Sequence, residues 1–151
     1  MKTIEEIKTI LSDIEAGEFM YRKLNDDDVP NLKELMNDAE PWMAARVIFA
    51  LSRLGGAEAH SIIEQAVTDE RKEVRIAVAA SSKVLPVTMS DSILESLIDD
   101  ADPGVKKYAI KSIDIGSHSR VKSKLQMLSV EGANETLRNM ATDRLFTIHN
   151  N

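Results

Sequence analysis

Apolar residues recur along the chain at helical spacing, and the same pattern returns at intervals of 31 or 32 residues. Each unit has a reference residue, an apolar residue that opens its second half: Met43, Val74, Val105 and Leu137. The positions 4, 8 and 11 residues later are almost all apolar, Ser82 and Gly116 being the exceptions. At about 100° per residue these offsets share one side of an α-helix. The pattern therefore predicts a helix in the second half of each unit.

A second apolar stripe precedes each of these predicted helices. The positions 11, 8 and 7 residues before the reference residue are apolar in the first three units, and in the first they are Leu32, Leu35 and Met36. In the fourth unit the stripe lies one residue early. Short polar turns, AEPW, ERKE and ADPG, separate the two stripes in the first three units. Because proline ends one helix and starts another well, each unit is predicted to be a helix pair joined by a tight turn.

Helix pairs of this length cannot bury their apolar sides alone, but they can when stacked in a row. The sequence therefore predicts an all-α fold, a right-handed α–α superhelix of about four helix pairs in one domain, residues 1–151. The expected repeats are about 31–61, 62–92, 93–123 and 124–151. Residues 1–30 depart from the pattern. Their apolar helical spacing at Ile4, Ile7, Leu11 and Ile14, ended by Gly17, predicts an N-terminal helical cap.

Charged residues flank the turns at constant distances from the reference residue. An Asp lies five residues before it in the first three units, and a base lies one residue after it in the last three. These residues are Asp38, Asp69, Asp100, Arg75, Lys106 and Arg138. A base at this offset points sideways from the apolar stripe, toward the neighbouring unit. We interpret the two series as a structural inter-repeat ladder, each exposed pair contributing about 0.2–1 kcal/mol.

The pattern resembles a known repeat. Its most regular segments are ARVIFALSRLGGAEA (45–59), TDERKEVRIAVAA (68–80) and DDADPGVKKYAIKSI (99–113). They are similar to the HEAT-like repeat, in the short form found in phycobilisome-lyase-type repeat proteins, over about residues 31–149. The resemblance implies a HEAT-like solenoid whose second helices line a concave face. Most proteins of this kind are protein-binding scaffolds, whereas some are bilin lyases, DNA glycosylases or iron hydroxylases, so the fold alone does not decide the activity.

The concave-face positions lie 2, 6 and 9 residues after each reference residue. They are small and apolar in the first unit, basic in the middle of the chain and mixed at its end. The expected contacts are Phe49, Ile76, Lys83, Lys107 and Lys111. Two interpretations of Phe49 and Ile76 stay open here: they form an anchor pocket for a partner, or the protein itself buries them.

Composition narrows the possible chemistry. The net charge is −6, and no run of Lys and Arg of the kind that nucleic acid requires is present. Cysteine is absent, His60, His118 and His149 have no Asp or Glu next to them, and no H-x-x-H or H-E-x-x-H motif is present. The chain also has no phosphate-binding loop or nucleophile motif. We therefore expect no catalytic residue, no metal and no cofactor.

The expected function is a non-enzymatic scaffold for protein–protein interaction. Its concave surface would bind a protein or peptide, and its lysines favour an acidic one. The alternative is a bilin-lyase-like protein that holds a tetrapyrrole, whose propionates would pair with Lys83, Lys107 or Arg75. Since neither a secretory signal nor a spanning segment is evident, we expect a cytoplasmic monomer without nucleic-acid or membrane partners.

Overall fold

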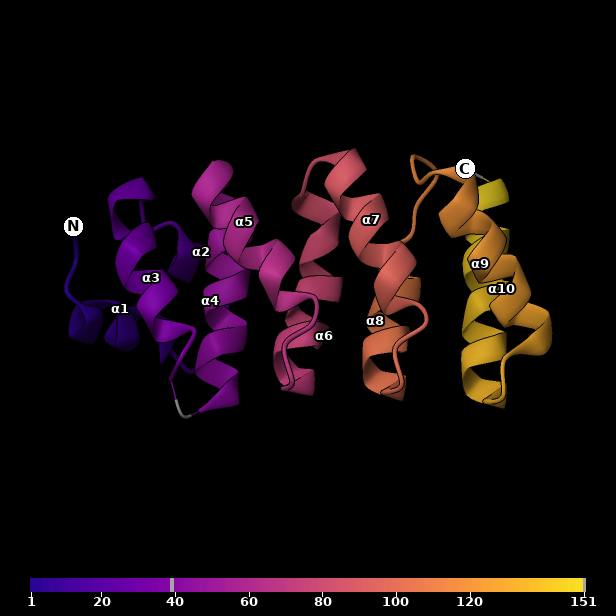
Figure 1. Cartoon of the computed structure of the whole chain (residues 1–151), viewed down its shortest axis with the longest axis horizontal. Coiled ribbons are helices and arrows are strands. Elements are labelled where there is room, and N and C mark those ends of the chain that lie inside the picture. The colour runs from indigo at the N-terminus through magenta and orange to yellow at the C-terminus, as the bar shows by residue number, and fades with distance from the viewer. Residues whose placement is uncertain (39, 151) are drawn as a thin grey trace.

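The computed structural model describes residues 1–38 and 40–150, which form helices and no strand. The helices stand side by side in a row, with the two termini at its opposite ends (Figure 1). In chain order they are α1 (Ile4–Leu11), α2 (Glu18–Tyr21), the 3₁₀ turn η1 (Asp26–Asp28), α3 (Val29–Leu35), α4 (Pro41–Leu54), α5 (Ala57–Ala66), α6 (Lys72–Ser81), the 3₁₀ turn η2 (Ser82–Val84), α7 (Val87–Leu97), α8 (Pro103–Ser112), α9 (Ser119–Glu131) and α10 (Glu135–His149). This all-α superhelix confirms the predicted fold class.

The helices form two layers. Figure 1 shows the first helices of the pairs, α3, α5, α7 and α9, in front of the second helices, α4, α6, α8 and α10. The second helices pack extensively on their successors, from α4 to α6 to α8, whereas successive first helices touch much less. The second-helix layer is thus the more closely packed of the two, as expected of the concave side of a solenoid. The side of α4, α6, α8 and α10 that points away from the first helices is called the inner face below.

One core runs along the whole row. The reference residues Met43, Val74, Val105 and Leu137 are all buried. In the first helices, positions 31 residues apart are fully buried as well: Leu32, Ile63, Leu94 and Leu125. Ser82, a polar exception in the predicted stripe, is buried too. Its Oγ donates a hydrogen bond to the Ala79 carbonyl at 2.7 Å. Satisfying the hydroxyl in this way makes a serine acceptable in the core.

Local sequence sets the helix ends. Pro41 and Pro103 lie in the first turns of α4 and α8, where the missing N–H has no intrahelical partner to lose. Asp102 caps α8 by accepting hydrogen bonds from the backbone N–H groups of Gly104 at 2.8 Å and Val105 at 3.1 Å. Gly55, with φ at 72°, ends α4 in a region that favours glycine.

The N-terminal cap packs on the first pair. Helix α1 buries Ile7 and Leu11 and contacts both α3 and α4. Arg46 of α4 donates to the backbone carbonyl groups of Leu11 and, at 2.8 Å, of Asp13. This places a cation at the C-terminus of α1, where the helix dipole favours it.

Asp28 is a buried carboxylate at the junction of cap and repeats. It accepts hydrogen bonds from the backbone N–H groups of Lys2 at 2.7 Å and Asn25 at 3.0 Å, and pairs with the Lys2 ammonium at 3.2 Å. Burial raises the pKa of Asp28, but these donors outweigh burial and hold its pKa below the usual range. Asp28 therefore ties the N-terminus to α3.

The last pair carries a polar residue at a position that is buried and apolar in the other pairs. The position five residues after the reference residue is buried and apolar in the first three pairs, as Ile48, Ala79 and Ile110. In α10 it is Thr142, which is exposed. No helix within the described ranges is both long and apolar enough to cross a membrane.

Candidate functional site

Basic residues are concentrated in the second-helix layer. Helices α4, α6 and α8, with the turn η2, contain eight Lys or Arg residues and one acid, Glu73. The first helices α5 and α7 contain four acids and no Lys or Arg. In a chain of net charge −6, this layer therefore has the opposite sign to the rest of the molecule. The linear sequence shows no basic run, because only stacking brings these residues together.

The middle of the inner face contains a tyrosine between two lysines. Lys107 and Lys111 of α8 are exposed, and their Nζ atoms lie 5.9 and 5.5 Å from the ring centroid of Tyr108. Neither lysine has an ion-pair partner among residues 1–38 and 40–150, nor has the exposed Lys83 of η2. These side chains provide cationic groups and an aromatic edge for an anionic ligand.

Tyr108 lies on the side of α8 that faces α6. Ser112, one turn further along α8, donates its hydroxyl to the Ala79 carbonyl of α6 at 2.8 Å. Residues four apart share one side of a helix, so Tyr108 borders the same seam. The candidate site is therefore centred on the seam between α6 and α8.

The N-terminal cap covers Phe49. Its ring lies 6.5 Å from that of Tyr21 of α2, between centroids, and the Arg53 guanidinium lies 5.7 Å from the Phe49 ring centroid. Arg53 in turn pairs with Glu18 of α2, Nη2 to Oε1, at 2.6 Å. Phe49 is half-buried, and the covered part of its ring packs on α2.

Ile76 forms part of the floor of the inner face. It is half-buried and packs against the core. A Cβ atom added at Gly104 would lie 3.3 Å from the Ile76 Cδ1, so α8 approaches α6 closely beside this side chain. Ile76 is therefore a low apolar surface between the helices rather than the wall of a deep pocket.

One rung of the expected ladder is present in the structure. Arg75 of α6 pairs with Asp100 of the next unit through two bonds, Nε to Oδ2 at 2.9 Å and Nη2 to Oδ1 at 3.2 Å. Burial raises the pKa of Asp100, but the Arg75 guanidinium and the Asp102 backbone N–H lower it by more than burial raises it. The pKa of Asp100 therefore lies below the usual range. The rung joins the base of one unit to the acid of the following unit.

This register explains why the ladder is incomplete, which corrects the expectation of a regular series. The base that would meet Asp69 is replaced by Ala44. The acid 25 residues after Lys106 is Glu131, but the two form no ion pair among the described residues. Asp69 pairs instead with Arg71 of its own turn at 2.8 Å. Among the described residues, only Arg75 and Asp100 form a rung.

The other expected members have different partners. Asp38 pairs with Lys8 of α1 at 3.0 Å. Arg71, which is not one of the expected members, also donates to the Met36 carbonyl of the first unit at 2.8 Å. It thus joins two units through a backbone carbonyl rather than through a carboxylate. Arg138 donates to the Gly132 carbonyl of its own turn at 2.6 Å.

The outer layer contains a contact that sequence reasoning missed. The backbone N–H and Nδ1 of His118 both contact the buried carboxylate of Asp91, the backbone distance being 3.2 Å. The two residues are 27 positions apart, so no local spacing signals the pair. His118 itself is exposed, and no group of three or more His, Cys, Asp or Glu suited to a metal ion occurs within the described ranges.

The His118 contact is the first of three between α7 and the α9 segment. Glu95 pairs with Arg120 at 3.5 Å, and Asp99, just beyond the end of α7, pairs with Lys124 at 2.5 Å. The three acids are spaced by four residues, so they share one side of α7. We call these three pairs the outer zipper.

Comparison with known proteins supports the architecture. Neither protein families nor curated protein sequences give a match to this chain. Among solved structures the chain is similar to a designed armadillo repeat protein in complex with the peptide (KR)4, with a TM-score of 0.55 and 19% sequence identity. The similarity covers 96% of this chain and 81% of that protein. The chain therefore has the fold of a helical repeat solenoid.

Proposed function

We propose that this protein is a non-enzymatic, HEAT-like repeat scaffold that binds a segment of another protein along its inner face. Two helices per repeat support the HEAT-like assignment, since armadillo repeats have three. The designed armadillo protein of similar fold holds a peptide. A stacked array of this kind presents a preformed surface, which limits the ordering cost of binding.

The bound segment is acidic in this proposal. The observation that carries it is the separation of charge between the layers, with eight basic residues and one acid in α4, α6, η2 and α8. Exposed Lys83, Lys107 and Lys111 are the proposed contacts, with Ile76 beneath them. The designed protein binds the basic peptide (KR)4, whereas the sign of the charge in this inner layer favours the opposite kind of ligand.

Fluorescence anisotropy with two labelled probes, the peptides (DE)4 and (KR)4, tests the proposal. We expect (DE)4 to bind and (KR)4 not to bind. Binding should weaken as salt is raised, because the contacts are exposed charges. The charge reversals Lys107→Glu and Lys111→Glu should each weaken (DE)4 binding by about tenfold.

Lys33→Glu is the matched control. Lys33 is exposed on α3, in the other layer, and its reversal changes the net charge by the same amount. The proposal is wrong if this control weakens (DE)4 binding as much as Lys107→Glu does. Preferential binding of a labelled oligonucleotide over (DE)4 would assign the basic layer to nucleic acid instead.

The tetrapyrrole alternative stays a prediction. Of the bases it invokes, Arg75 already holds Asp100, which leaves Lys83 and Lys107 for the two propionates. Mixing the protein with a bilin and recording the absorbance spectrum tests it. An unchanged spectrum removes the alternative.

A further inference from the structure

The last helix pair is packed differently from the others. In each of the first three pairs, the two helices contact each other less than the second helix contacts its successor. In the last pair α9 and α10 pack extensively on each other, whereas α10 packs less on α8, and α9 less on α7. The segment 113–118 joins this pair to α8. Helices α9 and α10 therefore form a hairpin that is held together more firmly than it is held to the row.

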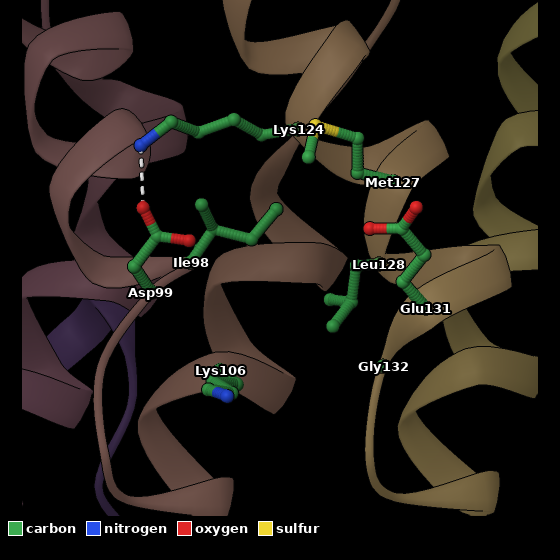
Figure 2. A pocket seen from close by; sticks show the side chains of 8 residues that line it. All are labelled: Ile98, Asp99, Lys106, Lys124, Met127, Leu128, Glu131 and Gly132. Carbon is green, nitrogen blue, oxygen red and sulfur yellow. Dashed lines mark hydrogen bonds and ion pairs between the residues drawn. The ribbon is translucent and has the colours of Figure 1, made fainter.

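Three cavities lie along the junction between this hairpin and the third pair. One of about 440 Å³ lies beside Asp91 and His118, at the starts of α7 and α9. Another, of about 260 Å³, lies between α8 and α10 beside Lys111. The third, of about 290 Å³, opens between the C-terminal ends of α7 and α9 and the start of α8 (Figure 2). We call this third cavity the turn-end pocket. Because a void removes packing contacts, these cavities leave the hairpin room to shift.

The turn-end pocket separates the two members of a ladder rung. At the preceding junction Arg75 pairs with Asp100, 25 residues further along the chain. Lys106 and Glu131 lie 31 residues after these two and have the same separation. Both line the turn-end pocket and project from different sides of it (Figure 2), but they form no ion pair among the described residues. The chain thus supplies a base and an acid in the register of a rung that is open in this structure.

The hairpin is attached more firmly at its opposite end. There the segment 113–118 enters α9, and the backbone N–H of His118 donates to the buried carboxylate of Asp91 at 3.2 Å. At the turn-end pocket the charged contact is the pair of Lys124 and Asp99, whose carboxylate is 66% exposed. A bond to a buried carboxylate resists separation better than an exposed ion pair does. A shift of the hairpin should therefore move its turn end most.

We propose that the α9–α10 hairpin pivots about its His118 end, and that closure of the turn-end pocket pairs Lys106 with Glu131. Closure would also cover Met127, which is 59% exposed at the pocket, and burial of this apolar side chain favours the closed state. The same pivot moves α10 relative to Lys111 and so reshapes the end of the inner face. The pivot concerns the junction itself and does not depend on what the inner face binds.

Nitroxide labels on the turns between paired helices test the proposal by electron paramagnetic resonance. Ala101 and Ala133 are exposed, and each lies four residues before a reference residue. Since the chain has no cysteine, Ala101→Cys with Ala133→Cys places two labels across this junction alone. The matched control is Glu70→Cys with Ala101→Cys, the equivalent exposed positions across the preceding junction. We expect two separations for the first pair of labels, and one separation for the control pair.

Variants connect the shorter separation to the rung. Glu131→Gln should abolish it, and the exchange Lys106→Glu with Glu131→Lys should restore it, because the ion pair is rebuilt with its charges reversed. Raising the salt concentration should also reduce it, since salt screens exposed charges. Glu135→Gln is the matched control variant, because Glu135 is exposed in the first turn of α10 and does not line the pocket. Circular dichroism verifies that each variant folds.

Three results would overturn the proposal. The first is a single separation between the labels at 101 and 133 that Glu131→Gln leaves unchanged, because the rung would then form by side-chain rotation alone or not at all. The second is an equal effect of Glu135→Gln and Glu131→Gln. The third is a shorter separation that the charge exchange fails to restore. Binding of (DE)4 is measured separately, so failure of the pivot is distinguishable from failure of the proposed function.

Discussion

At the scale of single residues, two serines at equivalent positions differ in their hydrogen bonds. Ser81 and Ser112 both lie seven residues after a reference residue, and both are buried. The hydroxyl of Ser112 contacts the carbonyl groups of Ala79 and Tyr108, each at 2.8 Å. The hydroxyl of Ser81 has no partner within the described ranges. The two positions therefore contribute differently to stability, although the sequence pattern treats them alike.

We predict that Ser112→Ala lowers the free energy of unfolding by about 0.5–1.5 kcal/mol, the usual net contribution of a hydrogen bond. Ser81→Ala should leave the free energy of unfolding unchanged or raise it, because it removes an unsatisfied polar group. Urea unfolding followed by circular dichroism measures both variants. A loss for Ser81→Ala as large as that for Ser112→Ala would contradict the assignment.

At the scale of helices, the junction between the third and fourth pairs differs from the others. Helices α4, α6 and α8 pack extensively on one another, whereas α8 packs less on α10. The outer zipper joins α7 to the α9 segment by three charged contacts. This junction therefore relies more on electrostatics, and less on apolar packing, than the junctions before it.

The buried member of the outer zipper should matter most. We predict that Asp91→Ala destabilises α9 and α10 by about 1–3 kcal/mol, because it removes the buried carboxylate that accepts the hydrogen bond of the His118 backbone N–H. Hydrogen exchange should then become faster in α9 and α10 but not in α4. Asp99→Asn is the control: this carboxylate is 66% exposed, and its loss should cost less than about 1 kcal/mol. Equal effects of the two variants, or faster exchange in α4, would contradict the prediction.

At the scale of the whole molecule, carboxylates at successive junctions share one property. Asp28 at the cap, Asp69 in the second turn and Asp100 in the third all have a pKa below the usual range. For Asp69 the main cause is the hydrogen bond from the Arg71 side chain, and for Asp28 and Asp100 the donors outweigh the effect of burial. Each group favours the folded state only while it is ionised.

The sign of the pH dependence follows. A carboxylate whose pKa is lowered on folding contributes full stability above its unfolded pKa of about 4, and that stability is lost as the pH falls toward the folded value. We predict that the thermal midpoint falls between about pH 4 and pH 2, and that Arg75→Gln makes this fall less steep by removing the partner of Asp100. Thermal unfolding followed by circular dichroism across this pH range measures how steeply the midpoint falls. An unchanged slope in Arg75→Gln would contradict the assignment of Asp100.

The sequence by itself determined the helix pairs, their stacking and the exposure of Lys83, Lys107 and Lys111. The physical reason is that apolar periodicity decides which side of a helix is buried, and this information is local. Offsets from Met43, Val74, Val105 and Leu137 were enough to locate the core.

Only the tertiary structure decided which side chains of different units meet. The contact of His118 with Asp91, the cover of α2 over Phe49 and the concentration of bases in one layer all depend on how successive units are placed. Such contacts depend on turn lengths and helix separation, which periodicity along the chain does not encode.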